Sequence, residues 1–171
     1  MKEIGMKNSL AKSKDITPQN IANFFLSKSA LSPKKVQKLV YYAYAWYIAL
    51  NNQDPKSIDQ TLFKEEPEAW MHGPVFRSLY TKYKDYGWRE IPKNRFMHKT
   101  GIENADIKSF LNDIWDKYGR YSADQLEFMT HQEDPWKRAR LGIDKLSPSN
   151  AKISKEDIFV FYNIQSMSAQ E

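Results

Sequence analysis

Residues 33–51 read PKKVQKLVYYAYAWYIALN, and this stretch decides the fold. A helix starts at Ser32-Pro33, because serine caps the free amides of a first turn and proline suits the first helical position. Apolar side chains follow at helical spacing on one face and cover the opposite face too; the two sets are Val36, Leu39, Val40, Ala43, Tyr47 and Leu50, then Tyr42, Ala45, Trp46 and Ala49. A helix that is apolar all round belongs in the middle of a domain. The apolar run over residues 39–50 is too short to cross a bilayer.

The flanking sequence predicts further helices around this central one. Thr17-Pro18 repeats the start signal, and Ser122 with Gln125 forms a capping box. Apolar spacing or start signals predict other helices that begin near residues 75, 107, 135 and 154. The total is six or seven helices, so the predicted fold class is mainly α, a single compact helical domain.

A different kind of segment interrupts the helices around residues 60–75. Short apolar runs are separated there by Glu-Glu-Pro and closed by Gly73-Pro74. Such a pattern predicts a small β-hairpin or an irregular insert. We interpret Gly73-Pro74 as a sharp break that launches the following helix.

Length, composition and charge fit one domain. A chain of 171 residues has the usual size of a single domain, and its 14% aromatic content argues against disorder. Residues 1–16 are polar and lysine-rich, so we expect a flexible leader over 1–16 and one domain over 17–171. The leading lysines have no apolar stretch behind them, unlike a signal peptide, and cysteine is absent. We therefore expect a cytoplasmic protein that does not use a membrane.

Catalytic motifs are scarce. The sequence has no cysteine nucleophile, no GxSxG elbow and no Gly-rich phosphate loop. His131, Glu133 and Asp134 lie close together, and His72 could join them in a metal or general-base site. The alternative is structural: His131 ends a helix, where its ring interacts with the last carbonyls, and Glu133 or Asp134 caps the next helix. We favour this alternative and predict no catalytic residue, no metal and no other cofactor.

The central helix carries features of an interaction surface. Lys34, Lys35 and Lys38 lie in its first turns, where positive charge is unfavourable without a partner, so they indicate contact with an anion or an acidic partner. Its tyrosines cannot all face the core, so some are half-exposed or hydrogen-bonded in the interior. Exposed Tyr and Trp side chains are typical anchors of protein interfaces.

A second basic patch combines Lys137, Arg138 and Arg140 with the neighbouring Trp136. Cations beside aromatic rings are typical of nucleic-acid binding, but a solvated helix face explains the same pattern. The net charge of +5 permits nucleic-acid contact without indicating it. We favour the solvated face.

Three blocks of sequence, taken in order, carry a family resemblance. They are Leu31-Ser32 with residues 36–43 and Trp46; residues 68–75; and Tyr118-Gly119, Ser122-Ala123 and Leu126 with residues 130–136. Together they resemble the Panacea domain of SocA-like antitoxins and phage-associated proteins. The resemblance extends over residues 20–165. This chain departs from the family pattern at Val36, His72 and Met129, and His72, where an aromatic residue is common, could change the choice of partner.

The resemblance implies a mainly helical antitoxin that pairs with a toxin and neutralises it by direct binding. One branch of the family acts instead as an adaptor that delivers its toxin to a protease. The family has no established catalytic residues, so the resemblance implies none here. It also implies a bacterial or phage origin.

We therefore expect a non-enzymatic antitoxin whose protein partner is a toxin encoded nearby. The expected partner-binding residues are Lys34, Lys35, Lys38, Tyr42, Trp46, Trp70 and His72, and residues 64–72 are the second choice of surface. The expected fold-defining residues are Gly73, Pro74, Thr130, His131, Pro135 and Trp136.

Two other functions stay open. One is a nucleic-acid-associated regulator of a phage or mobile element, which the second basic patch would favour if it shared one surface with the N-terminal lysines. The other is a hydrolase, which needs His131 exposed in a cleft beside a carboxylate or a metal.

Overall fold

The described part of the chain contains seven α-helices and one two-stranded hairpin. The structure is a computed structural model that describes residues 16–93 and 100–168. Its elements are α1 (Pro18–Leu26), α2 (Pro33–Asn51), β1 (Glu68–Trp70), β2 (Gly73–Val75), α3 (Arg77–Tyr83), the short 3-10 helix η1 (Lys84–Tyr86), α4 (Ala105–Tyr118), α5 (Ala123–Gln132), α6 (Asp134–Ala139) and α7 (Lys155–Ser168). The predicted mainly α fold class is confirmed. Residues 1–15 of the expected leader lie outside the described residues, and the division into leader and domain stays a prediction.

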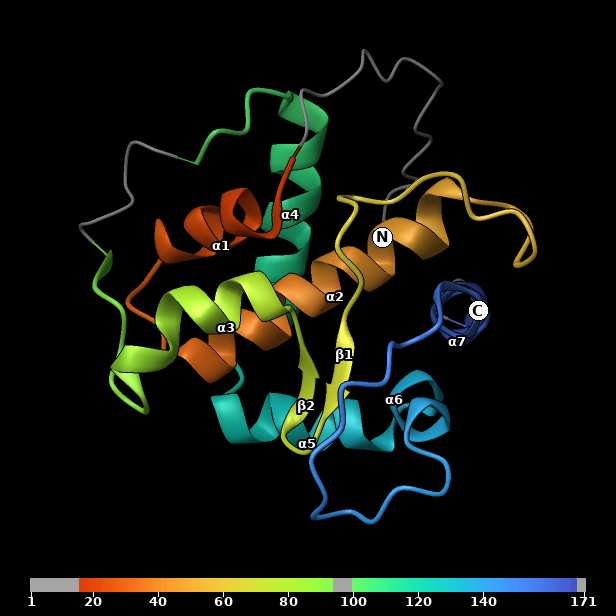
Figure 1. Cartoon of the computed structure of the whole chain (residues 1–171). Helices are drawn as coiled ribbons and strands as arrows, with labels where there is room; N and C mark the ends of the chain where they lie inside the picture. The colour runs from red at the N-terminus through yellow and green to blue at the C-terminus, as the bar shows by residue number, and fades with distance from the viewer. Residues whose placement is uncertain (1–15, 94–99, 169–171) are drawn as a thin grey trace.

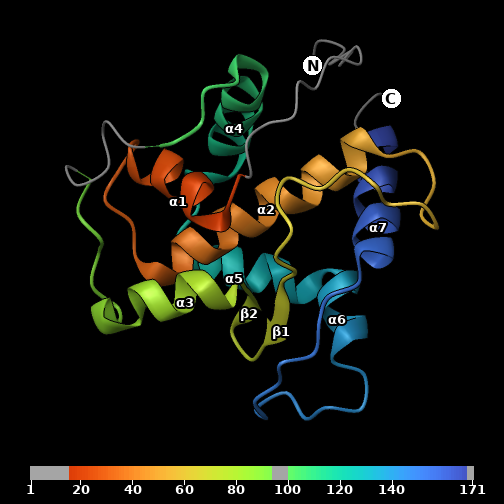
Figure 2. The ribbon, with the colours of Figure 1, turned by 45° about the horizontal axis from the view of Figure 1, so that its top comes forward.

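Helix α2 forms the centre of the fold, as its apolar circumference predicts. Every side chain from Val36 to Ala49 is buried, and α2 contacts α1, α3, α4, α5, α7 and β2. Figures 1 and 2 show α2 crossing the middle of the molecule, with α1 and α3 on one side and α7 on the other. Because neighbours surround α2, Tyr41, Tyr42 and Tyr44 are all 1% exposed or less, so Tyr42, which we expected to contact a partner, lies inside the fold.

The helix starts follow their local sequence signals. Thr17 accepts a hydrogen bond from the backbone of Asn20, whose side chain binds back to the Thr17 backbone. Ser122 and Gln125 form the same reciprocal pair at α5, and Ser32 caps α2. Each cap satisfies amides that have no partner inside the helix, so the sequence alone places these ends.

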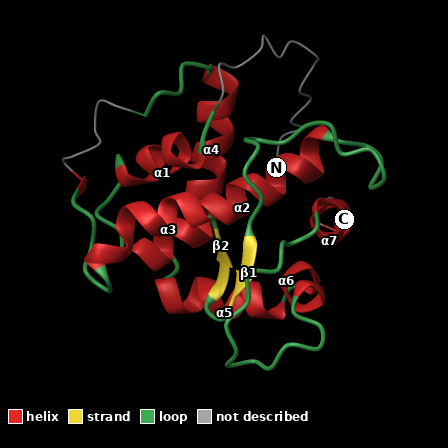
Figure 3. Ribbon diagram, in the orientation of Figure 1, coloured by secondary structure: helices red, strands yellow, loops and turns green. Residues whose placement is uncertain are grey.

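Strands β1 and β2 form an antiparallel hairpin, drawn in yellow in Figure 3. Gly73 has a φ of 95°, which favours glycine. The expectation that Gly73-Pro74 launches a helix is wrong, because both residues lie in β2 and α3 begins at Arg77. Pro74 pairs with Ala69, whose amide donates instead to Ala151 on the other side. The missing proline N–H therefore costs the hairpin no hydrogen bond.

Candidate functional site

The hairpin lies between α2 and the corner where α5 meets α6, so the three sequence blocks come together in space. Three hydrogen bonds join them: Lys38 Nζ donates to Pro74 O (3.1 Å), Trp136 Nε1 to Trp70 O (3.0 Å) and Tyr42 Oη to Glu133 Oε1 (2.9 Å). We call this region the block junction.

Lys38 lies under the hairpin rather than on the surface. Its side chain is 1% exposed, and loss of hydration lowers the pKa of its ammonium to about 7. Gly73 packs directly over it: a Cβ added at Gly73 would lie 2.7 Å from Lys38 Cε and 2.8 Å from Thr130 Oγ1. The close approach of these three residues requires glycine at position 73.

Glu133 is the most unusual group of the block junction. It precedes α6, but its side chain makes no capping hydrogen bond and turns into the core. Tyr162 Oη donates to Glu133 Oε2 at 2.6 Å, and Tyr42 donates to the other oxygen. Burial raises the pKa of Glu133 to about 7, although the two hydroxyl hydrogen bonds act in the opposite direction. The sequence alone did not predict this role, because its pattern indicated a helix cap or a metal ligand at Glu133.

Aromatic side chains from three helices, α2, α4 and α7, surround Glu133. Tyr42 stacks on Tyr118 with ring centres 3.9 Å apart, and Trp46 Nε1 donates to Tyr118 Oη at 2.8 Å. Tyr162 packs edge-on against Trp46. Because these rings exclude water, Tyr42 and Trp46 hold the core together and cannot touch a partner while the fold stays closed.

His131 faces the Trp136 ring rather than an open cleft. The two rings stack with centres 4.1 Å apart, His131 Nε2 is buried without a hydrogen-bond partner, and the Met71 backbone bonds the ring. Burial lowers the pKa of the imidazole. Within the described residues, no carboxylate hydrogen-bonds this ring and no three His, Asp or Glu side chains could hold a metal. The geometry that a hydrolase would need is not present around His131.

The lysines at the start of α2 have partners inside the chain. Lys34 Nζ lies 2.6 Å from both Asp124 and Glu127 of α5, and His72 Nδ1 lies 2.9 Å from Glu127. Lys35 Nζ donates to the carbonyl of Gly119. Burial tends to raise the pKa of Glu127, but the hydrogen bonds from Lys34 and His72 outweigh it and lower this pKa. The acids of α5 therefore neutralise much of the positive charge that we expected a partner to neutralise.

The second basic patch does not form a shared basic surface. Arg140 is buried and binds backbone carbonyls, and Arg138 pairs with Asp157 at 3.0 Å. Lys137 alone of this patch is left facing solvent without such a partner among the described residues. The arrangement that would favour nucleic-acid binding is therefore missing from this patch, and the N-terminal lysines of residues 1–15 lie outside the described residues.

Trp70 lies at the edge of the hairpin, half-buried. Its Nε1 donates to Glu68, and its ring lies 4.7 Å from the Tyr80 ring and 5.6 Å from the Arg77 guanidinium. The buried Glu68 carboxylate also pairs with Arg77 (2.8 Å) and Lys152 (3.1 Å), and these hydrogen bonds lower its pKa against the effect of burial. Of the expected partner-binding residues, Lys34, Lys35, Trp70 and His72 reach the surface, whereas Lys38, Tyr42 and Trp46 do not.

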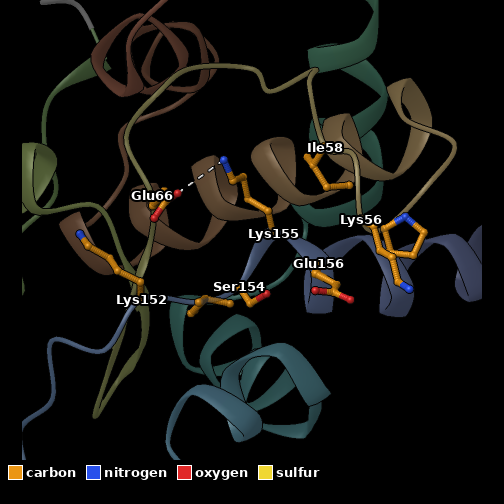
Figure 4. A pocket seen from close by; sticks show the side chains of 9 residues that line it. Lys56, Ile58, Glu66, Lys152, Ser154, Lys155 and Glu156 are labelled. Atoms are coloured by element: carbon orange, nitrogen blue, oxygen red, sulfur yellow. Dashed lines mark ion pairs between the residues drawn. The ribbon is translucent and has the colours of Figure 1, made fainter.

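Figure 4 shows a surface cavity of about 390 Å³ at the start of α7. Lysines and glutamates alternate along it, and Lys155 pairs with Glu66 across it at 3.5 Å. Of the residues expected to contact a partner or to define the fold, only Glu66, from the second-choice surface over residues 64–72, lines this cavity. We therefore assign the candidate site to the block junction and the surface beside it.

Comparison with known proteins assigns the region of the three blocks to a protein family. A family model described as "Antitoxin SocA-like, Panacea domain" matches residues 36–137, which is more than half of the chain. No curated protein matches, and no solved structure matches. Within the described residues, no helix has the length and apolar character needed to cross a membrane.

Proposed function

The chain belongs to the family of SocA-like antitoxins with a Panacea domain, and we propose that it neutralises a toxin by binding it directly in the cytoplasm. The family match carries this proposal. The block junction supports it, because Lys38, Tyr42 and Glu133 are buried there and their hydrogen bonds go to the backbone or to other buried side chains. A binding role uses the surface around such a core and leaves the core closed.

The proposed contact surface lies where α2, α5 and the hairpin turn meet. Lys34 and His72 bind the same carboxylate, Glu127, so these two side chains are neighbours although they lie far apart in sequence. Lys34 and His72 remain partly exposed, with 35% and 64% of their side chains accessible. Lys35 and Trp70 extend the surface on either side. A mixed surface of cations and one aromatic ring suits a toxin with an acidic face.

A growth-rescue assay tests the proposed function. Each small open reading frame beside this gene is expressed alone and then together with this chain, and the two proteins are purified together. We expect one neighbour to stop growth alone, to become harmless on co-expression and to co-purify at a fixed ratio. If every neighbour is harmless alone, the antitoxin proposal fails for this chain.

The same assay separates occlusion from delivery to a protease. Direct occlusion leaves the toxin at full abundance in a stable complex, whereas an adaptor lowers toxin abundance in cells with active cytoplasmic proteases. Lys34→Glu combined with His72→Glu should weaken rescue, because the double variant places two added carboxylates on a surface proposed to contact an acidic partner. Lys56→Glu, which lies at the cavity of Figure 4, is the matched control and should rescue fully. If the two variants rescued growth equally, Lys34 and His72 would not belong to the contact surface.

A further inference from the structure

The loop between α6 and α7 presents two large apolar side chains to solvent. Leu141 is 78% exposed and Leu146 is 80% exposed, whereas most large apolar residues of the described chain lie in the core. Single exposed leucines are common on protein surfaces. Two of them on one short loop, over residues 141–149, need an explanation if that loop is also held rigidly.

A buried arginine holds the loop. Arg140 is 5% exposed; its Nη1 donates to Ala69 O of β1 at 2.8 Å, and its Nη2 donates to Asp144 O and Ser147 O, both at 2.8 Å. No carboxylate pairs with this guanidinium in the described part of the chain. The hydrogen bonds of this buried charge therefore go to carbonyls of the hairpin and of the loop.

Local hydrogen bonds fix the tip of the loop as well. Asp144 Oδ1 accepts from the Leu146 amide at 2.9 Å, and the Ser147 amide donates to Asp144 O at 3.1 Å. Leu146 thus stands on a closed turn, and Leu141 follows directly after the anchored Arg140. A backbone that is held in place before association loses little conformational freedom on binding, and apolar residues on it can make strong interface anchors.

The charges around the two leucines indicate the chemistry of the partner. Lys137 and Lys145 are exposed beside them. Among the described acids near the loop, Asp144 is engaged by the Leu146 amide and Asp157 by Arg138. The amide does not neutralise the Asp144 carboxylate, but over residues 137–149 four basic residues outnumber this one acid, so the leucines project from a segment of net positive charge. A complementary protein surface has an apolar pocket bordered by carboxylates.

We propose that the 141–149 loop is an anchor that inserts Leu141 and Leu146 into an apolar, acid-rimmed pocket of the toxin. This inference rests on the proposed function and deepens it by naming a second part of the contact surface. The loop lies beyond residues 36–137, which the family model matches, so this anchor belongs to the part of the chain that the shared domain does not specify.

Binding of the rescuing neighbour, purified as its inactive form, tests the anchor. Leu141→Ser combined with Leu146→Ser should weaken the complex about 30-fold and abolish rescue, because truncation of two central anchors has this size of effect. Ile164→Ser is the matched control, since Ile164 is an exposed apolar residue on α7, and it should change affinity less than about threefold. Unchanged unfolding midpoints verify that both variants fold.

A protection experiment gives a second readout on the unaltered chain. A lysine-specific protease should cut after the exposed Lys145 in the free protein, and the bound toxin should block this cut. Full affinity of the double variant, or an unprotected Lys145 in the complex, would overturn the proposed anchor. Rescue by the wild type would still support the proposed function in that case. If no neighbour is toxic, the proposed function fails and the anchor fails with it.

Discussion

Tyr162 Oη donates a 2.6 Å hydrogen bond to Glu133 Oε2, and this contact ties the last helix to the corner between α5 and α6. Tyr42 of α2 binds the other oxygen of the same carboxylate. One buried acid therefore joins three segments that lie far apart in the chain. The energetic consequences of this arrangement can be measured on the protein without its partner.

Glu133→Gln should remove a pH dependence of stability. The pKa of Glu133 rises from 4.5 to about 7 on folding, so the folded state binds the proton more tightly than the unfolded state. The associated stability is fully present below pH 4.5 and is lost as the pH rises through about 7. Relative to the variant, the wild type should lose up to about 3 kcal/mol of unfolding free energy between pH 4.5 and pH 8. Urea unfolding at a series of pH values measures this difference, and parallel curves for the two proteins would contradict it.

Tyr42→Phe should destabilise the protein more than Tyr44→Phe. The Tyr42 hydroxyl binds the buried Glu133, whereas the Tyr44 hydroxyl is buried without a hydrogen-bond partner. Removing the Tyr42 hydroxyl leaves one Glu133 carboxylate oxygen unpaired and should lower the free energy of unfolding by about 1–2 kcal/mol. Removing the second deletes an unpaired polar group and should change stability by less than about 0.5 kcal/mol. Chemical unfolding followed by tryptophan fluorescence compares the two, and equal losses would refute the assignment.

Gly73→Ala should lower the free energy of unfolding by about 2 kcal/mol more than Gly87→Ala does. Both glycines have positive φ, 95° and 58°, so both substitutions strain the backbone. At Gly73 the new methyl group would also collide with Lys38 and Thr130, whereas at Gly87 no atom lies within 4 Å. The difference between the two unfolding free energies isolates the collision. A difference near zero would show that the hairpin turn moves away from α2 at little cost.

Arg140→Met should loosen the 141–149 loop while leaving the core folded. The variant loses the hydrogen bonds that hold the Asp144 and Ser147 carbonyls. Native-state cleavage after Lys145 by a lysine-specific protease should become about tenfold faster, because local opening governs such cleavage. Arg138→Met removes an exposed ion pair with Asp157 and is the control, with an expected change below about twofold. Equal cleavage rates would show that Arg140 does not hold the loop.

Local signals in the sequence predicted much of the fold. Thr17, Ser32 and Ser122 each start a helix because a side-chain oxygen accepts a hydrogen bond from the backbone amide three residues on, which depends on no distant segment. The apolar circumference of α2 predicted its central position, since such a helix must be covered on every side. The Gly73-Pro74 pair marked the hairpin region but not its strand, because the pairing depends on Ala69 and Ala151.

The candidate site was less predictable, because burial of a polar side chain depends on what folds over it. Lys38 looks like its neighbours Lys34 and Lys35 in the sequence, yet the hairpin covers only Lys38. Glu133 looks like a helix cap until α2 and α7 bring two hydroxyls to it.

The sequence by itself therefore determined the capped starts of α1, α2 and α5, the mainly helical fold and the family, since these rest on local chemistry and on the order of motifs. Only the tertiary structure decided which charges and tyrosines lie inside. Their partners come from segments up to 91 residues away, as Tyr42 and Glu133 show, and their pairing exists only once the chain has folded.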